Sequence, residues 1–147
     1  MNLVLFNSSI IMSYSHILSL FLYNPYNPLM IFIYILGMFT SIINHGTKSE
    51  FMKYTDRLTM FLGFFIDLYF IRQIYINTKN NKAIIIILIL LISTVSLYFL
   101  SKLIKNNIND IDKTVDKLFV GNFLHYCAHI FISITHIFII KEYSSLE

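Results

Sequence analysis

Residues 83–100 read AIIIILILLISTVSLYFL, and this uncharged stretch decides the fold class. About 20 apolar residues in helical conformation cross the roughly 30 Å hydrocarbon core of a bilayer. The rest of the chain is similar, since 56% of its 147 residues are hydrophobic and only 13% are charged. A soluble domain carries about twice that charged fraction. Composition therefore excludes a soluble enzyme and a disordered tail, and the small net charge of +3 argues against binding to nucleic acid.

Five segments are apolar enough to form membrane-spanning helices. We expect them at residues 3–23, 29–44, 57–76, 83–103 and 118–140. The sequence NPYNP at residues 24–28 separates the first two, because its prolines end one helix and open the next. Five such helices leave no room for a soluble domain. The predicted fold is a single all-α, polytopic transmembrane bundle that covers residues 1–147.

Several polar residues of these spans fall on one face of the membrane. The alternating direction of the helices puts the end of the second span and the starts of the third and fifth on the same side. The residues placed there are Ser41, His45, Asp56, His125 and His129. A single histidine in a membrane helix is more often a hydrogen-bonded packing residue than a ligand. Ionisable groups at membrane depth are costly, however, so their gathering on one face favours a functional site.

The spacing of the histidines predicts a zinc centre. His125 and His129 are one helical turn apart, so both imidazoles can aim at a common point, and His45 can supply a third nitrogen. Three protein ligands with an open fourth position are typical of catalytic zinc. In this hypothesis Asp56 acts as general base and Ser41 hydrogen-bonds a developing oxyanion.

Residues 41–60, SIINHGTKSEFMKYTDRLTM, resemble the core of the alkaline ceramidase family, within the wider CREST group of membrane hydrolases. The matching positions are Ser41, His45, Thr47, Asp56, Leu58 and Met60, together with the His-x3-His pair His125 and His129. The resemblance implies that the three histidines bind Zn²⁺ and that Asp56 and Ser41 assist the attacking water and the substrate carbonyl. It also implies a lipid substrate such as ceramide. The expected location is a membrane that the chain spans several times, an endomembrane such as the ER or Golgi for a eukaryotic chain or a host membrane for a viral one.

The chain departs from that family in three respects. Family members have seven spans, whereas five are expected here, so the ceramide-binding chamber is shortened. The family's tryptophans near the last histidines are replaced by Tyr126, Cys127 and Ala128. The acidic cluster that binds calcium is missing, since no Asp or Glu precedes Glu50, and calcium control is not expected.

These residues predict a zinc-dependent membrane hydrolase that cleaves the amide of a ceramide-like lipid. Two alternatives stay open. One is a lipid esterase or phospholipase with the same metal chemistry. The other is a non-catalytic lipid sensor or interaction protein that keeps a structural metal site.

The remaining polar residues suggest structural roles. Asp67 and His136 lie about three turns beyond Asp56 and His125 on the same helical stripes, so we expect a buried hydrogen-bonded pair deeper in the membrane. No partner is evident for His16. Charged residues between the fourth and fifth spans are interpreted as a solvated connection, with a lid as the alternative. They are Lys102, Lys105, Asp110, Asp112, Lys113, Asp116 and Lys117.

Overall fold

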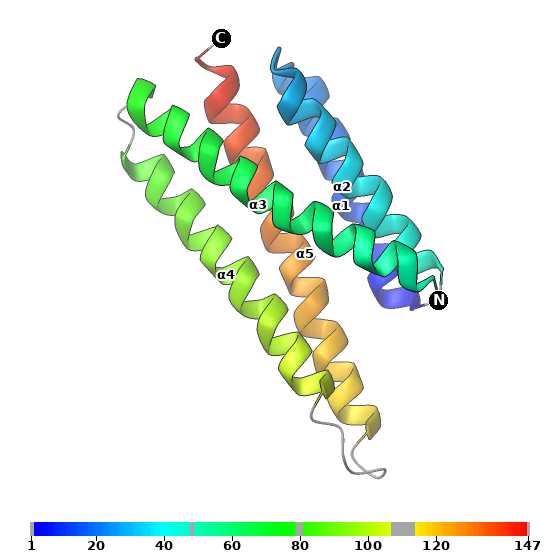
Figure 1. Ribbon diagram of the computed structural model, residues 1–147. Helices are drawn as coiled ribbons and strands as arrows, with labels where there is room; N and C mark the ends of the chain where they lie inside the picture. Colours follow the sequence, from blue (N-terminus) through cyan, green and yellow to red (C-terminus); the bar gives the residue numbers. More distant parts are fainter. Residues whose placement is uncertain (1, 48, 79–80, 107–113, 147) are drawn as a thin grey trace.

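The computed structural model describes residues 2–47, 49–78, 81–106 and 114–146. Within these ranges the chain forms five helices and no strand (Figure 1). The helices are α1 (Leu3–Tyr23), α2 (Pro28–Gly46), α3 (Glu50–Thr78), α4 (Asn81–Asn106) and α5 (Thr114–Ser144). The predicted all-α fold with five spans is confirmed.

The turn between α1 and α2 forms where the NPYNP sequence predicts it. Asn24 ends α1 in the left-handed conformation, with a φ of 44°. The Asn27 side chain accepts hydrogen bonds from the backbone N–H groups of Leu29 and Met30, and so caps the start of α2. Pro28 occupies the first position of that helix, where no N–H is required.

The last three helices extend at both ends beyond the segments expected for them, and α5 covers Thr114–Ser144 where residues 118–140 were expected. α3 begins at Glu50, and α4 continues to Asn106, because a charge ends the apolar stretch without ending the helix. Asp56 therefore lies within α3 and close to α2. The interpretation of the charged residues 102–117 as a connection is wrong for those that the structure places in helices, which are Lys102, Lys105, Asp116 and Lys117. Asp110, Asp112 and Lys113 lie outside the described residues.

Helix α5 lies among α1, α3 and α4 and contacts all three. α1 packs against both α2 and α5, and α4 runs along α5 on its other side (Figure 1). α3 crosses the bundle and contacts α2, α4 and α5. In the described part of the chain, α2 and α5 have no close backbone packing, so side chains must bridge them. One such contact is the stacking of Tyr34 on His136, with ring centroids 4.2 Å apart.

The apolar core fills one half of the bundle. It is built from the beginnings of α2 and α4 and the ends of α3 and α5, and its fully buried members are Met30, Phe70, Ile74, Ile87, Ile139 and Ile140. His45, Asp56 and His125 lie toward the opposite ends of their helices. The polar residues therefore occupy the half of the bundle that this core does not fill.

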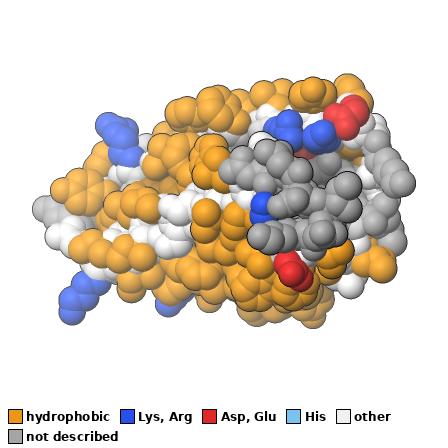
Figure 2. Space-filling view, turned by 90° about the horizontal axis from the view of Figure 1, so that it is seen from below, with side chains coloured by type: hydrophobic (Ala, Val, Ile, Leu, Met, Phe, Trp, Pro, Cys, Tyr) orange, Lys and Arg blue, Asp and Glu red, His pale blue; other side chains and the backbone are white. Residues whose placement is uncertain are grey.

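The outer surface of the bundle is largely apolar (Figure 2). On α4, for example, Ile89, Ile92 and Phe99 are 58–64% exposed. All five helices are long and apolar enough to cross a membrane. Exposed apolar surface of this extent is unfavourable in water, so the structure indicates a multi-pass membrane protein.

Candidate metal centre

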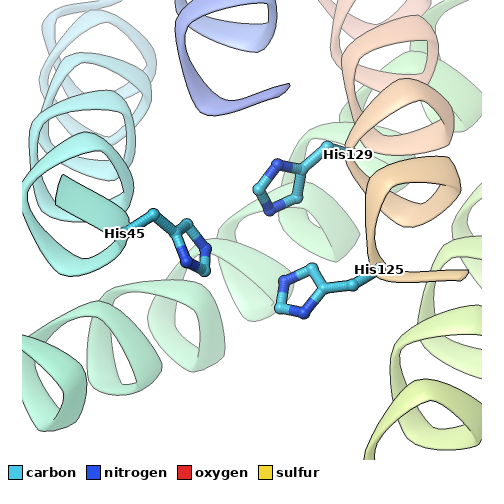
Figure 3. Close-up of side chains that lie close together, drawn as sticks. All are labelled: His45, His125 and His129. Atoms are coloured by element: carbon cyan, nitrogen blue, oxygen red, sulfur yellow. The ribbon is translucent and has the colours of Figure 1, made fainter. Parts of the chain in front are cut away.

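Three histidines from two helices converge at one end of the bundle. His45 comes from the last turn of α2, and His125 and His129 come from successive turns of α5 (Figure 3). One ring nitrogen of each lies within 4.8 Å of those of the other two. The ring centroids are 4.9–5.5 Å apart. The structure thus brings together the three residues that spacing selected.

A serine of α1 fixes the proton position on His129. Ser8 Oγ lies 2.8 Å from the carbonyl oxygen of Leu5 and 2.8 Å from His129 Nδ1. A hydroxyl has one hydrogen, and Ser8 donates it to the carbonyl, so Nδ1 of His129 must be the donor to Ser8. Nε2 of His129 is then unprotonated and available as a ligand, as in metal sites where a hydrogen bond to one ring nitrogen orients the imidazole so that the other nitrogen binds the metal.

His125 is the most buried of the three and is only partly satisfied. It is 5% exposed, and its Nδ1 has no hydrogen-bond partner among the described residues. The ring of Tyr98 meets it edge-on, with centroids 5.3 Å apart. A buried ring nitrogen without a partner is unfavourable, so a ligand or water that supplied one would stabilise this side of the cluster.

The donor set fits zinc. Neutral imidazole is a preferred zinc ligand. In the described part of the chain, no hydrogen bond joins two of the three imidazoles, so no such bond would have to break before a metal could bind. In a tetrahedral site with Zn–N bonds of about 2.1 Å, the nitrogens stand about 3.4 Å apart. The observed spread of up to 4.8 Å therefore needs only a modest side-chain contraction.

One oxygen of Asp56 is held in place by the residue that precedes His45. Asp56 is 5% exposed, and its Oδ2 accepts a hydrogen bond of 2.6 Å from Asn44 Nδ2. Asn44 precedes His45, so the last turn of α2 supplies both a metal-ligand candidate and the group that orients the carboxylate. Asp56, His45 and His125 line the same pocket. The geometry suits a base that faces a shared polar space.

Ser41 lies one helical turn before His45 on α2, and its side chain is turned toward α1. Its Oγ lies 3.0 Å from Ser9 Oγ, and Ser9 donates its own hydrogen to the carbonyl of Leu5. Ser41 must therefore donate to Ser9, which leaves its hydroxyl hydrogen engaged. Ser41 does not line the pocket that contains Asp56 and His45.

Two cavities of similar size flank the histidines. The first, which we name the basic pocket, has a volume of about 150 Å³ and its wall includes His45, His125 and Asp56. Four cationic side chains complete much of that wall, namely Lys53, Arg57, Lys102 and Lys105. The second, the apolar cavity, measures about 160 Å³ between α1 and α5 and is lined mainly by Ile11, Met12, Ile130 and Ile134, with His129 and Ser8 beside them.

A second polar group lies deeper, and it contains the predicted pair of Asp67 and His136. Nε2 of His136 lies 3.0 Å from Asp67 Oδ2, which confirms that pairing. Tyr34 donates to the other carboxylate oxygen at 3.0 Å. His16, for which the sequence offered no partner, is hydrogen-bonded through Nε2 to Nδ1 of His136. We name these four residues the buried network.

Sequence reasoning missed the contribution of α1. Its polar side chains line one face and are buried, although the helix as a whole is apolar. They are Ser8, Ser9, Ser13, His16 and Ser19. At 100° per residue they fall within an arc of about 140°, so their periodicity already indicated a polar stripe directed into the bundle. No comparable sequence signal identified Asn44 or the cationic wall of the basic pocket.

The remaining motif residues lie outside the cavities. Thr47 ends α2 and donates its hydroxyl to the carbonyl of Ile43 at 2.8 Å. Leu58 and Met60 are exposed on α3.

In comparisons with known proteins, no family model, curated protein or solved structure matches this chain. The link to alkaline ceramidases therefore rests on the motif residues themselves.

Proposed function

We propose that this protein is a multi-pass membrane hydrolase that uses zinc to cleave the amide bond of a ceramide-like lipid. The observation that carries the proposal is the convergence of His45, His125 and His129 beside Asp56. The resemblance to alkaline ceramidases supports the same chemistry, and it favours an endomembrane such as the ER or Golgi, or a host membrane for a viral chain.

The three histidines would hold the metal, with Ser8 orienting His129. Zinc at this position would supply Lewis-acid chemistry, activating water and polarising the substrate carbonyl. Asp56 accepts the proton of the attacking water and later returns it to the leaving amine. Asn44 keeps the carboxylate turned toward the pocket throughout. For Ser41 to donate a hydrogen bond to the developing oxyanion, its side chain must first rotate and break the hydrogen bond to Ser9.

The positions of the cavities support a lipid substrate. The basic pocket and the apolar cavity touch the same histidine cluster from two sides, through His45 and His125 in one case and His129 in the other. An amphipathic molecule needs both kinds of environment. In this proposal the acyl chain enters from the bilayer between α1 and α5, the polar headgroup occupies the basic pocket, and the scissile carbonyl lies between them.

The test combines metal content with turnover. The purified wild-type protein should contain about one zinc per chain, and it should release fatty acid from ceramide when zinc is bound. The His125→Ala variant should lose both properties. A wild-type protein without stoichiometric metal would refute the metalloenzyme proposal.

The same assay separates the alternatives. Release of fatty acid from phospholipids and not from ceramides would favour an esterase or phospholipase, because the metal chemistry is shared and only the scissile bond differs. Stoichiometric zinc without turnover on either panel, together with an unchanged metal content in Asp56→Ala, would favour a non-catalytic protein with a structural metal site.

A further inference from the structure

The basic pocket carries more positive charge than its own acid can balance. Its wall holds four cationic side chains and one carboxylate, that of Asp56. One of the four, Lys53, forms an ion pair of 3.0 Å with Glu50 outside the pocket. Among the described residues, no carboxylate forms an ion pair with the other three cations, Arg57, Lys102 and Lys105. They surround a space that also borders the metal-ligand candidates.

Packing directs Lys105 into this pocket. Its aliphatic stem lies across Gly121 of α5, where a Cβ atom would stand 2.7 Å from Lys105 Cγ. One turn earlier on α4, Ser101 donates a 2.7 Å hydrogen bond to the carbonyl of Gly121 and fixes the two helices together. Lysines at a membrane interface usually extend freely toward water. Here the close approach of α4 and α5 holds the stem in place.

Aromatic contacts position a second cation. The ammonium of Lys102 lies 5.3 Å from the ring centre of Tyr98, within the range of cation–π attraction. The same ring meets His125 edge-on. Lys102 is thereby connected through Tyr98 to the histidine cluster, and Nδ1 of His125 still lacks a hydrogen-bond partner in the described part of the chain.

Cations that share a single carboxylate still repel one another, and a doubly charged metal among the histidines would add to that repulsion. An anion with several oxygen acceptors would relieve it. Phosphate suits this role because guanidinium and ammonium groups donate strongly to its oxygens. The basic pocket and the apolar cavity have similar volumes, about 150 and 160 Å³, and it is the cationic wall of the first that suits a charged headgroup and not an acyl chain.

We propose that the basic pocket binds the phosphate of an anionic lipid headgroup, with Arg57, Lys102 and Lys105 around the phosphate oxygens. The consequence for catalysis rests on the proposed function: the lipid cleaved carries a phosphate next to its acyl linkage, so a phosphorylated ceramide is a better substrate than ceramide itself.

Binding is measured first, without turnover. The purified full chain in neutral detergent is titrated with fluorescent short-chain ceramide 1-phosphate and with the matching ceramide, and anisotropy reports complex formation. The phosphorylated lipid should bind about tenfold more tightly, because it adds charge-assisted hydrogen bonds. Equal affinities for the two lipids would overturn the proposal.

Variants locate the effect in the pocket. Lys105→Gln should remove most of the preference for the phosphorylated lipid, and Gly121→Ala should weaken it by displacing the lysine stem. Lys141→Gln is the control, since it deletes the same charge from an exposed position near the end of α5, far from the pocket. An equal loss in Lys141→Gln would overturn the proposal, because it would show general attraction of anionic lipid to a basic protein.

Competition identifies the source of the phosphate. Displacement of the lipid by inorganic phosphate would show that the phosphate group suffices, whereas an anionic lipid that resists this competitor would point to recognition of a membrane-anchored headgroup. Both results support a phosphate site. Turnover is measured separately. A binding preference for the phosphorylated lipid without hydrolysis of either lipid would refute the proposed function and leave this phosphate site standing. Equal binding and equal hydrolysis of the two lipids would refute the phosphate site and leave the proposed function standing.

Discussion

Two groups of histidine and aspartate residues lie in this bundle, and they differ in what their polar atoms contact. In the buried network, both carboxylate oxygens of Asp67 and both ring nitrogens of His136 have partners. In the histidine cluster near Asp56, ring nitrogens face one another with no hydrogen bond between them in the described chain, and they border two cavities. Each group also keeps one buried ring nitrogen without a partner among the described residues, Nδ1 of His16 in the network and Nδ1 of His125 in the cluster. The difference is that His125 borders a cavity, whereas His16 lines neither of the two cavities described above.

The contrast indicates how function can be located in a membrane helix bundle. Polar groups in hydrocarbon must find partners, and a group that satisfies its members internally stabilises helix packing. A group left partly unsatisfied beside a cavity costs free energy unless a ligand completes it. His16 and Tyr34 supply the remaining partners of His136 and Asp67, and the unpartnered Nδ1 of His16 borders neither cavity. The unpartnered Nδ1 of His125 belongs to a residue that lines the basic pocket, where a ligand could reach it.

The largest expected effect is the loss of the metal after removal of one histidine of the cluster. His125→Ala should lower zinc affinity by more than about 100-fold, because even loss of a partner of a ligand costs about 10–100-fold. Elemental analysis after dialysis measures it. His136→Ala, three turns along the same helix, is the matched control and should keep the metal while lowering thermal stability, since it leaves Asp67 buried with one partner fewer. Equal zinc loss in both variants would remove the distinction between the two groups.

The two aspartates should separate activity from stability. Asp56→Asn should retain zinc but reduce hydrolysis by about 100- to 10,000-fold, the range for loss of a general base. Asp67→Asn should keep hydrolysis close to that of the wild type and reduce the yield or melting temperature instead, because its carboxylate serves only the buried network. Fatty-acid release and thermal unfolding in detergent report the two quantities. An inactive but fully stable Asp67→Asn variant would assign the buried network a role in the reaction.

A smaller effect is expected from the serine that orients His129. Ser8→Ala removes the acceptor of the Nδ1 proton, so zinc affinity should fall by about 10- to 100-fold. Ser13→Ala is the control, since Ser13 belongs to the same polar stripe but hydrogen-bonds only to the carbonyl of Ser9 in its own helix. Competition with a calibrated chelator measures both affinities. Similar affinities in the two variants would show that Ser8 does not act through His129.

The members of both histidine and aspartate groups could largely be predicted from the sequence. The partners that come from α1 could not, and the reason is physical. Helical periodicity and alternating helix direction were sufficient to bring His45, His125 and His129 together and to pair Asp67 with His136. Both arguments use only the rise and rotation of a helix. They do not say which neighbour lies against a given face, so the partners of His16 and the serines of α1 stayed hidden until the packing of α1 against α2 and α5 was known.

Helix length explains the other differences. The end of an apolar segment marks the depth of the membrane and not the end of the helix, so Lys102 and Lys105 were taken for a connection although they continue α4 into the basic pocket. Ser41 shows a related limit. Spacing placed it one turn from His45, but only its hydrogen bond to Ser9 reveals where its hydrogen is directed.

The smallest expected effect concerns a single hydrogen bond of the buried network. Tyr34→Phe deletes a single hydrogen bond to Asp67 and keeps the ring that stacks on His136. His136 still pairs with the carboxylate, so unfolding should become easier by only about 1 kcal/mol, the usual net value for one such bond between membrane helices. Reversible unfolding in mixed detergent measures the difference, and zinc content should not change. A loss of zinc in Tyr34→Phe would mean that the two groups are coupled through α5, since His136 and His129 lie two turns apart on that helix. The comparison would then describe one extended site and not two separate groups.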